Sequence, residues 1–365
     1  MKVNNYNYGQ ISVLINSYGA HDNDENHIKI AEFNKINLFT ISKISDYFND
    51  TPFFNYGYMN IERINSEYVH PKFKELYDLI ENIIIQNNIK LFIWLGDPIM
   101  LHSSFINKIK KLCYISAWTF DDPMTSERVV KPVARLYNCI FHVAPYYSEG
   151  KTTKEVFEEW GVPKSELIHN GVNEGKYNRK VDFGNRDIDI VFVGSVFRER
   201  LIFLFKLKKY FGKKLHIYGY GWNGENMPFF KKIFLYILKF YYGVPKIQTL
   251  NNKEYKKILQ RAKIGINDHM QNGAGPSSAR TFELPLNGVL QFCDIKNGIK
   301  YFFEANEVTT YEYKNVKSII PKIEYFLSNE SERIKIAKNG YTKSKNNHMI
   351  YHSFSKILEV YKSDC

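Results

Sequence analysis

The segment DIDIVFVGSVFRERLIFLFKLKKYFGKKLHIYGYGW (187–222) decides the fold. Its first apolar run ends at a glycine, a helical stretch rich in Leu and Phe follows, and a second apolar run ends in Gly-Tyr-Gly. Apolar runs of this length between turn residues predict strands that are buried on both faces of a parallel sheet. The order strand, helix, strand therefore predicts a βαβ unit.

The same alternation continues on both sides of this segment, and it predicts two doubly wound α/β domains with ligand sites facing a cleft. We expect an amino-terminal domain over residues 1–175, a carboxyl-terminal domain over 176–345, and a final helix over 346–365 that packs back on the first domain. The predicted strands are 11–15, 36–41, 90–96, 113–120, 139–144, 187–195, 214–222, 263–268 and 289–293. The predicted helices are 73–85, 154–162, 200–212, 252–262, 277–288, 314–328 and 330–346.

Composition excludes several classes of protein. The chain has 365 residues and a formal net charge of +12. Its 4 cysteines lie far apart without zinc-ligand spacing, which excludes a disulfide scaffold and a zinc module. No apolar run approaches the length of a membrane span, and the polar start lacks the apolar core of a secretory signal. We therefore expect a cytoplasmic protein.

The positive charge is concentrated in residues 198–263, which contain 16 basic and 3 acidic residues. A solvated surface, a polyanionic ligand, an anionic membrane and nucleic acid are all compatible with such a segment. Within it, PFFKKIFLYILKFYYGVPK (228–246) has the composition of an interfacial amphipathic helix, which would place the chain at the inner face of a membrane. We favour a core helix whose lysines extend outward into water.

Two strand ends in the second half have features of a phosphate or nucleotide site. The first has Gly194 and Ser195 in the turn, followed by Arg198 and Arg200 at the start of a helix. Glycine lets a ligand approach the backbone, a helix start offers unpaired N–H groups, and arginine donates to phosphate oxygens. The second is the Gly219, Tyr220 and Gly221 turn, and a plain tight turn explains it equally well.

The segment INDHMQNGAGPSSARTFELPLNG (266–288) is the most informative one. A strand ends at its start, a loop follows, and serines introduce a helix. Arg280 and Glu283 lie one helical turn apart, so the arginine can neutralise a diphosphate while the carboxylate accepts hydrogen bonds from ribose hydroxyls. The alternative is an Arg–Glu pair on a helix capped by serines. The donor-binding candidates here are Asp268, His269, Ser277, Ser278, Arg280, Thr281 and Glu283.

Together with AKIGIND, NGIKYFFEANEVTTY and IEYFLSNESERIKIAKNGY, these motifs resemble the GT-B glycosyltransferases of the spore-maturation-protein-B-like, glycosyl-transferase-group-1 type. The resemblance covers about residues 187–360 and reaches the first half only weakly. It implies two Rossmann-like domains, an acceptor bound by the first and a nucleotide diphosphate sugar bound by the second as co-substrate. It also implies that no metal and no other cofactor are needed. In many members a second glutamate stands where this chain has Gly275.

Catalytic candidates follow from the chemistry of sugar transfer, which needs the leaving phosphate stabilised and, on inversion, a base for the acceptor hydroxyl. Arg200 is the candidate for the leaving group. Asp121 and Asp122, which follow the strand 113–120, are the candidates for the base, although a helix cap or a surface charge would explain either residue.

Two alternatives to a glycosyltransferase are considered. One is an epimerase or hydrolase acting on nucleotide sugars with the same fold. The other is a non-enzymatic basic protein that binds anionic lipid or nucleic acid. We expect no nucleic-acid partner, because the basic segment contains no known RNA- or DNA-binding module. The expected acceptor is a glycan, a lipid-linked glycan or a protein.

Overall fold

The computed structural model describes residues 2–16, 24–42, 69, 71–120, 123–148, 150–173, 180–196, 198–225, 227–269, 278–294 and 298–365. The described residues form two compact units. Unit 1 contains residues 2–173 together with the final helix, 348–365. Unit 2 contains residues 180–269 and 278–347.

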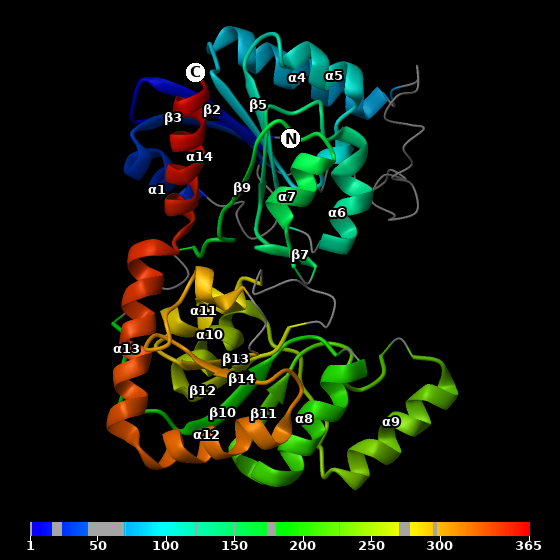
Figure 1. Ribbon diagram of the computed structural model, residues 1–365, viewed down its shortest axis with the longest axis vertical. Coiled ribbons are helices and arrows are strands. Elements are labelled where there is room, and N and C mark those ends of the chain that lie inside the picture. The colour runs from blue at the N-terminus through cyan, green and yellow to red at the C-terminus, as the bar shows by residue number, and fades with distance from the viewer. Residues whose placement is uncertain are drawn as a thin grey trace. The chain divides into compact units, whose positions relative to one another are not determined.

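Unit 1 is built on a seven-stranded sheet with the strand order β1-β3-β2-β4-β5-β6-β9 (Figure 1). All neighbouring strands pair in parallel except β1 and β3. The strands are β1 (Lys2–Asn7), β2 (Ile11–Asn16), β3 (Ile36–Ser42), β4 (Leu91–Leu95), β5 (Tyr114–Thr119), β6 (Cys139–His142) and β9 (Ser165–Leu167), and β7 (Tyr146–Ser148) pairs with β8 (Lys151–Thr152) as a separate hairpin.

Helices cover both faces of this sheet, which explains why its central strands are continuous apolar runs. In β4, Phe92 and Trp94 pack with α4, while Leu91 and Ile93 pack with α1 and α14 on the other face. The final helix thus completes the core of unit 1. The helices are α1 (Asp24–Asn34), α4 (Pro71–Gln86), α5 (Ser103–Ile109), α6 (Pro123–Val129), α7 (Thr153–Glu159) and α14 (Ile350–Asp364).

Unit 2 is built on a five-stranded, fully parallel sheet with the order β11-β10-β12-β13-β14. The chain runs from β10 outward to β11, then returns past β10 to β12, so the strand order reverses between β10 and β12. Ligands of open α/β sheets bind at such a switch point, beyond the carboxyl ends of the strands. The strands are β10 (Ile188–Val193), β11 (Leu215–Tyr218), β12 (Ala262–Asn267), β13 (Leu290–Asp294) and β14 (Thr309–Tyr311).

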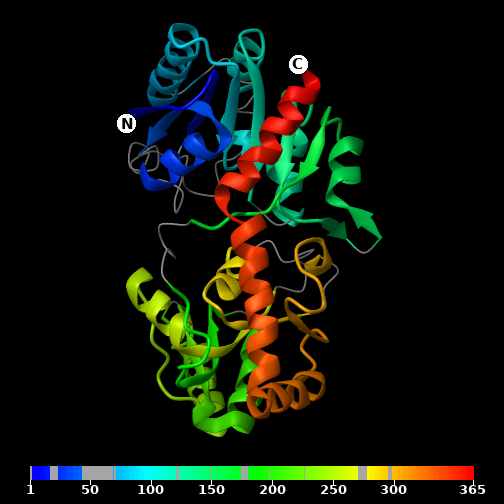
Figure 2. The same cartoon turned by 90° about the vertical axis from the view of Figure 1, so that its left-hand side faces the viewer.

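Helices also lie on both faces of the unit 2 sheet. Those on one face pack with Phe192 and Ile264, and α10 and α11 pack with Val191 on the other. Figure 2 shows the long helix α13 crossing unit 2. The helices are α8 (Arg198–Phe211), α9 (Phe229–Tyr241), α10 (Asn252–Arg261), α11 (Arg280–Leu286), α12 (Val316–Ser328) and α13 (Glu330–Asn347). No helix among the described residues is long and apolar enough to cross a membrane.

The prediction of a core helix within 228–246 is wrong. Helix α9 forms there, but its aromatic side chains face water: Phe230 is 83% and Phe240 is 91% exposed. Its buried residues are Leu235 and Lys239. The Lys239 ammonium turns inward and donates to Asn223 Oδ1 at 2.8 Å. The helix therefore has Leu235 and Lys239 on its inner side and presents its apolar side to solvent.

Candidate functional site

The candidate site lies at the switch point of unit 2, beyond the ends of β10 and β12. Gly194 and Ser195 follow β10, and Asp268 and His269 follow β12. The β11 end is adjacent, because the Gly194 N–H donates to the Tyr218 carbonyl at 2.9 Å. The ends of β10, β11 and β12 carry the three motifs that the sequence predicts to bind a nucleotide.

The Gly-Tyr-Gly turn after β11 is a close-packing device. Gly219 has φ +142°, and a Cβ added to it would lie 2.0 Å from the Gly194 carbonyl oxygen. Gly221 has φ +85°, and its added Cβ would lie 2.7 Å from Val196 Cγ1. Tyr220, between them, is 49% exposed. The glycines therefore allow the β10 and β11 loops to touch, while the tyrosine side chain between them stays half exposed.

Asp268 is the centre of a buried ion cluster. Arg200 donates from Nε to Asp268 Oδ2 at 2.9 Å and from Nη2 to its carbonyl at 2.5 Å, while Nη1 reaches the Ser195 carbonyl at 2.8 Å. Lys314 Nζ donates to both carboxylate oxygens. Desolvation lowers the pKa of Lys314, and Asp268 partly offsets that effect. Since Arg200 is only 6% exposed, it ties the β10 loop to the β12 end.

A second polar chain runs from β13 to α11. The His269 backbone N–H donates to Asp294 Oδ2 at 2.6 Å, and its Nδ1 lies 3.0 Å from Asp294 Oδ1. On the other side of the ring, Nε2 lies 3.5 Å from Thr281 Oγ1. The ligand atoms of His269, Cys293 and Asp294 all lie within 4.8 Å of one another, close enough to share a metal. The carboxylate already holds both the ring and the backbone of His269, so hydrogen bonding accounts for this group.

Arg280 and Glu283 lie beside this chain, on the first turn of α11. An added Cβ on Gly194 would lie 3.1 Å from Arg280 Nη2, so the guanidinium sits directly over the β10 turn. Arg280 Nε is buried and makes no hydrogen bond within the described residues. Tyr255 on α10 donates its hydroxyl to Glu283 Oε2 at 2.8 Å. Desolvation, followed by the charge of Glu283, raises the pKa of Tyr255 well above its ordinary value.

The helix start differs from the prediction. Helix α11 begins at Arg280, with Ala279 at the cap position and no side-chain capping bond, rather than at Ser277 or Ser278. The Ser278 hydroxyl instead lies 3.4 Å from Thr281 Oγ1. Of Arg198, only its place as the first residue of α8 is described. The predicted residues Asp121, Asp122 and Ser277, as well as Gly275, lie outside the described part of the chain.

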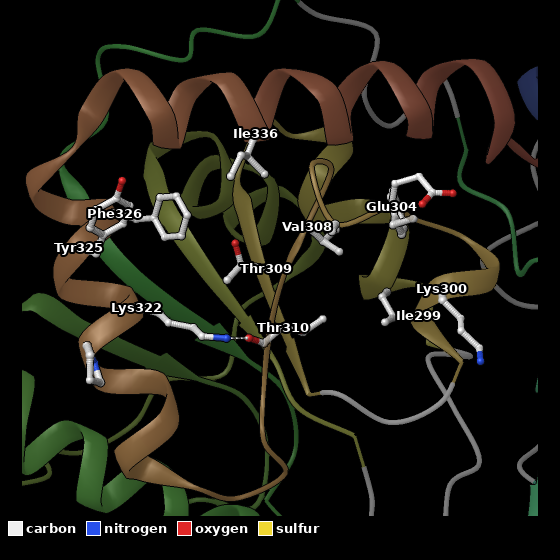
Figure 3. A pocket seen from close by; sticks show the side chains of 13 residues that line it. Ile299, Lys300, Glu304, Val308, Thr309, Thr310, Lys322, Tyr325, Phe326 and Ile336 are labelled. Carbon is white, nitrogen blue, oxygen red and sulfur yellow. Dashed lines mark hydrogen bonds between the residues drawn. The ribbon is translucent and has the colours of Figure 1, made fainter.

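A cavity of about 710 Å³ opens elsewhere in unit 2, along the edge strand β14. Apolar side chains of α12, including Phe326, line one wall, and Lys322 donates to the Thr310 carbonyl at 2.7 Å (Figure 3). None of its lining residues belongs to the candidate site beyond β10 and β12. The lysine covers a carbonyl of an edge strand, which is a common way to protect such an edge.

Three residues of the site gave no signal in the sequence. Lys314 joins Asp268 from 46 residues further along the chain, Asp294 joins His269 across two strands, and Tyr255 joins Glu283 from α10. Lys314 and Tyr255 can be assigned as partners only when the arrangement of strands and helices in space is known. Asp294 is the one that a sequence rule could have found, because it ends the predicted strand 289–293 at the same sheet edge.

A family model described as "Glycosyl transferase-like" matches residues 198–359, from α8 into α14. This range contains Arg200, Asp268, Arg280 and Glu283, the charged residues of the candidate site. No curated protein matches the sequence significantly.

Solved structures of glycosyltransferases are similar in fold over nearly the whole chain. A glycosyltransferase of Rickettsia africae has a TM-score of 0.64 at 14% identity, covering 98% of this chain and 99% of that one. Sucrose-phosphate synthase of Thermosynechococcus elongatus has 0.63 at 10%, covering 97% and 99%. HepE of Anabaena, in complex with UDP and glucose, has 0.60 at 10%, covering 97% and 100%. These comparisons confirm the predicted GT-B fold of two Rossmann-like domains.

Proposed function

We propose that this chain is a glycosyltransferase of the GT-B type and that the switch point of unit 2 binds its nucleotide diphosphate sugar. The nucleotide would enter beyond the ends of β10 and β12, with the ribose at Glu283 and the diphosphate at Arg280. The buried, unbonded Nε of Arg280 is the observation that carries this assignment. A buried donor without a partner costs free energy unless a ligand supplies an acceptor, and a phosphate oxygen is a strong one.

Glu283 is suited to vicinal hydroxyls. An ionised carboxylate only accepts hydrogen bonds, and its two oxygens can accept several of them at once. Tyr255 holds Oε2 from α10 at 2.8 Å, which fixes the orientation of the carboxylate before a ligand arrives. Preorganisation of this kind lowers the entropy cost of binding.

Arg200 takes a different role from the one expected of a phosphate ligand. Its guanidinium is occupied by Asp268 and the Ser195 carbonyl, so we assign it as a positioning residue for the β10 loop. Lys314 supports the same carboxylate from the β14 side. With Arg200 held there, Arg280 is the cation we propose for the leaving diphosphate. Its charge would stabilise the leaving group without a metal.

The acceptor and the catalytic base are proposed by chemical class. Unit 1 would bind the acceptor, which we propose to be a glycan, a lipid-linked glycan or a protein. Asp121 or Asp122 would supply the base if the enzyme inverts. HepE, whose structure contains UDP and glucose, supports a nucleotide-sugar donor for this chain as well.

The test is thermal unfolding with UDP, GDP, ADP, TDP and CMP, each with and without EDTA. A ligand that binds only the folded state raises the melting temperature by mass action. We expect one diphosphate to stabilise the wild-type protein, with the shift unchanged by EDTA and lost in Arg280→Met. The matched control is Arg261→Met, since that arginine pairs with Asp187 at the surface. No shift with any nucleotide, or an equal shift in Arg280→Met, would overturn the site.

A further inference from the structure

Helix α9 has an exposed apolar face with no counterpart in unit 2. Phe230, Phe234, Ile237 and Tyr241 recur at helical spacing, and each is more than half exposed. In both views, α9 lies at the margin of unit 2 (Figures 1 and 2). The exposed apolar side chains are Phe229 at 72%, Phe230 at 83%, Ile233 at 42%, Phe234 at 62%, Tyr236 at 52%, Ile237 at 60%, Phe240 at 91% and Tyr241 at 63%. A contiguous face of this kind marks a surface that binds something.

The orientation of α9 is the reverse of an ordinary surface helix. A soluble helix turns apolar residues inward and lysines outward. Here Lys239 is 5% exposed and bonded to Asn223, and desolvation lowers its pKa. The fold has buried a lysine of this helix while leaving its phenylalanines in water. Exposed apolar patches of this size are typical of surfaces that bind a partner or a membrane.

The surface beside this face is basic. A hollow of about 790 Å³ lies between α8 and α12, next to the end of α9, where Tyr242 forms part of its wall. Lys206, Lys209 and Lys317 line it together with Lys314, which is paired with Asp268, and no acidic residue is among its described lining residues. Two tyrosines of its wall, Tyr210 and Tyr313, donate to Glu324 and Glu199 beside it. The Lys209 ammonium lies 4.1 Å from the centre of the Tyr241 ring, so the apolar face and the basic hollow are continuous.

We propose that this combined surface docks on an anionic lipid bilayer, with the outer face of α9 at the level of the headgroups. Aromatic and aliphatic side chains beside lysines are the composition of helices that lie in a membrane interface. At 13 residues, α9 is about 20 Å long, so it lies on a bilayer rather than crossing it. A second copy of the chain is a less suitable partner for this surface. In a two-fold interface the lysines of the two hollows would lie near one another and repel.

The test is co-sedimentation of the full chain with vesicles of phosphatidylcholine alone and of phosphatidylcholine mixed with phosphatidylglycerol. We expect binding to the anionic vesicles that weakens as salt is added. Phe230→Ser with Phe240→Ser should lower the partition coefficient by more than about tenfold, since both side chains leave the interface. The control pair, Ile85→Ser with Leu112→Ser, removes two exposed apolar side chains of unit 1 and should bind like the wild type.

The lysines are tested in the same assay. Lys206→Gln, Lys209→Gln and Lys317→Gln together should abolish the preference for anionic vesicles, while Lys74→Gln, Lys90→Gln and Lys111→Gln should keep it. Nucleotide-dependent stabilisation is measured on every variant, and all of them should retain it because none lies in the donor site. Failure of wild type to sediment with anionic vesicles overturns the proposal. A self-association that the paired serine variant abolishes, without any vesicle binding, would overturn it in favour of a second copy.

Discussion

Both sheets have a point where the strand order reverses, but the side chains at the strand ends there differ in charge. In unit 1 the order also reverses, between β2 and β4, and Asn16 joins the two strand ends. Its amide donates to the Leu95 carbonyl at 2.8 Å and accepts from the Leu95 N–H at 2.6 Å. At the switch point of unit 2, the end of β12 is followed by Asp268, which is held by two cationic side chains.

This difference shows what the topology does and does not decide. Both folds bring strand ends together at a switch point. In unit 1 the Asn16 side chain bonds to backbone groups of Leu95, so the link between the two strand ends is uncharged. In unit 2 Asp268 pairs with Arg200 of α8 and with Lys314, and Arg280 Nε, over the β10 turn, makes no hydrogen bond within the described part of the chain. The side chains, and not the sheet, place the proposed donor site in unit 2.

The largest expected effect comes from breaking the ion cluster of unit 2. Asp268→Asn leaves Arg200 and Lys314 buried beside a neutral amide. Removing one partner of a buried ion cluster costs about 3–5 kcal/mol of unfolding free energy, because the remaining charges lose their compensation. Urea unfolding of the variant measures this loss.

Asp189→Asn is the matched control for that variant. Its carboxylate pairs with Lys263 at 2.6 Å, but both side chains are about a quarter exposed. We expect a loss below about 1 kcal/mol, since water replaces the lost partner. An equal loss in the two variants would mean that the Asp268 cluster contributes no more than a surface ion pair.

The next effect belongs to unit 1 and depends on pH. Burial lowers the pKa of His142 from 6.5 to about 4. Between these values the unfolded chain binds a proton that the folded chain does not, so stability is complete above pH 6.5 and falls as the pH drops toward 4. The loss amounts to about 3 kcal/mol. Urea unfolding measures the difference in unfolding free energy between neutral pH and pH 4. In His142→Phe this difference should be smaller than in the wild type by the loss given above. An unchanged difference would contradict the assignment to His142.

The smallest effect sharpens the comparison at the unit 1 switch point. Asn16→Ala leaves the buried N–H and carbonyl of Leu95 without their side-chain partner. We expect a loss of about 2 kcal/mol in unfolding free energy. Asn87→Ala is the control, because its partly exposed amide, just after the end of α4, donates to the Ile83 carbonyl, and its loss should stay below about 0.5 kcal/mol. Equal losses would show that the Asn16 bridge does not stabilise the strand ends.

Much of the fold could be predicted from the sequence because its central strands are buried on both faces. The run 187–195 became β10, and 263–268 became β12, within one or two residues. Strand β1 was missed because it lies at an antiparallel edge and reads as polar, and β14 because it has only three residues. Periodicity also could not show which side of α9 faces the core, since apolar residues surround that helix.

The site was predicted less completely for a physical reason. Arg280 and Glu283 are visible in the sequence because a helix places them one turn apart. The partners that decide their environment come from other segments, and contact between distant segments has no local pattern. Arg200 shows this most clearly. Its motif predicts that it binds phosphate, but in the folded protein its guanidinium hydrogen-bonds to Asp268.

The most direct test of the donor site is a calorimetric comparison of a nucleoside diphosphate and its 2′-deoxy counterpart on wild type and Glu283→Gln. The diphosphate is the one that stabilises the wild-type protein. If the ribose 2′-hydroxyl donates a hydrogen bond to the Glu283 carboxylate, Glu283→Gln raises the Kd of the ribonucleotide by about 10–100-fold. The Kd of the deoxynucleotide, which lacks this hydroxyl, should rise by clearly less. Glutamine keeps an acceptor for Tyr255, so the fold is preserved. Equal losses for the two nucleotides, or no loss for either, would contradict the placement of the ribose at Glu283.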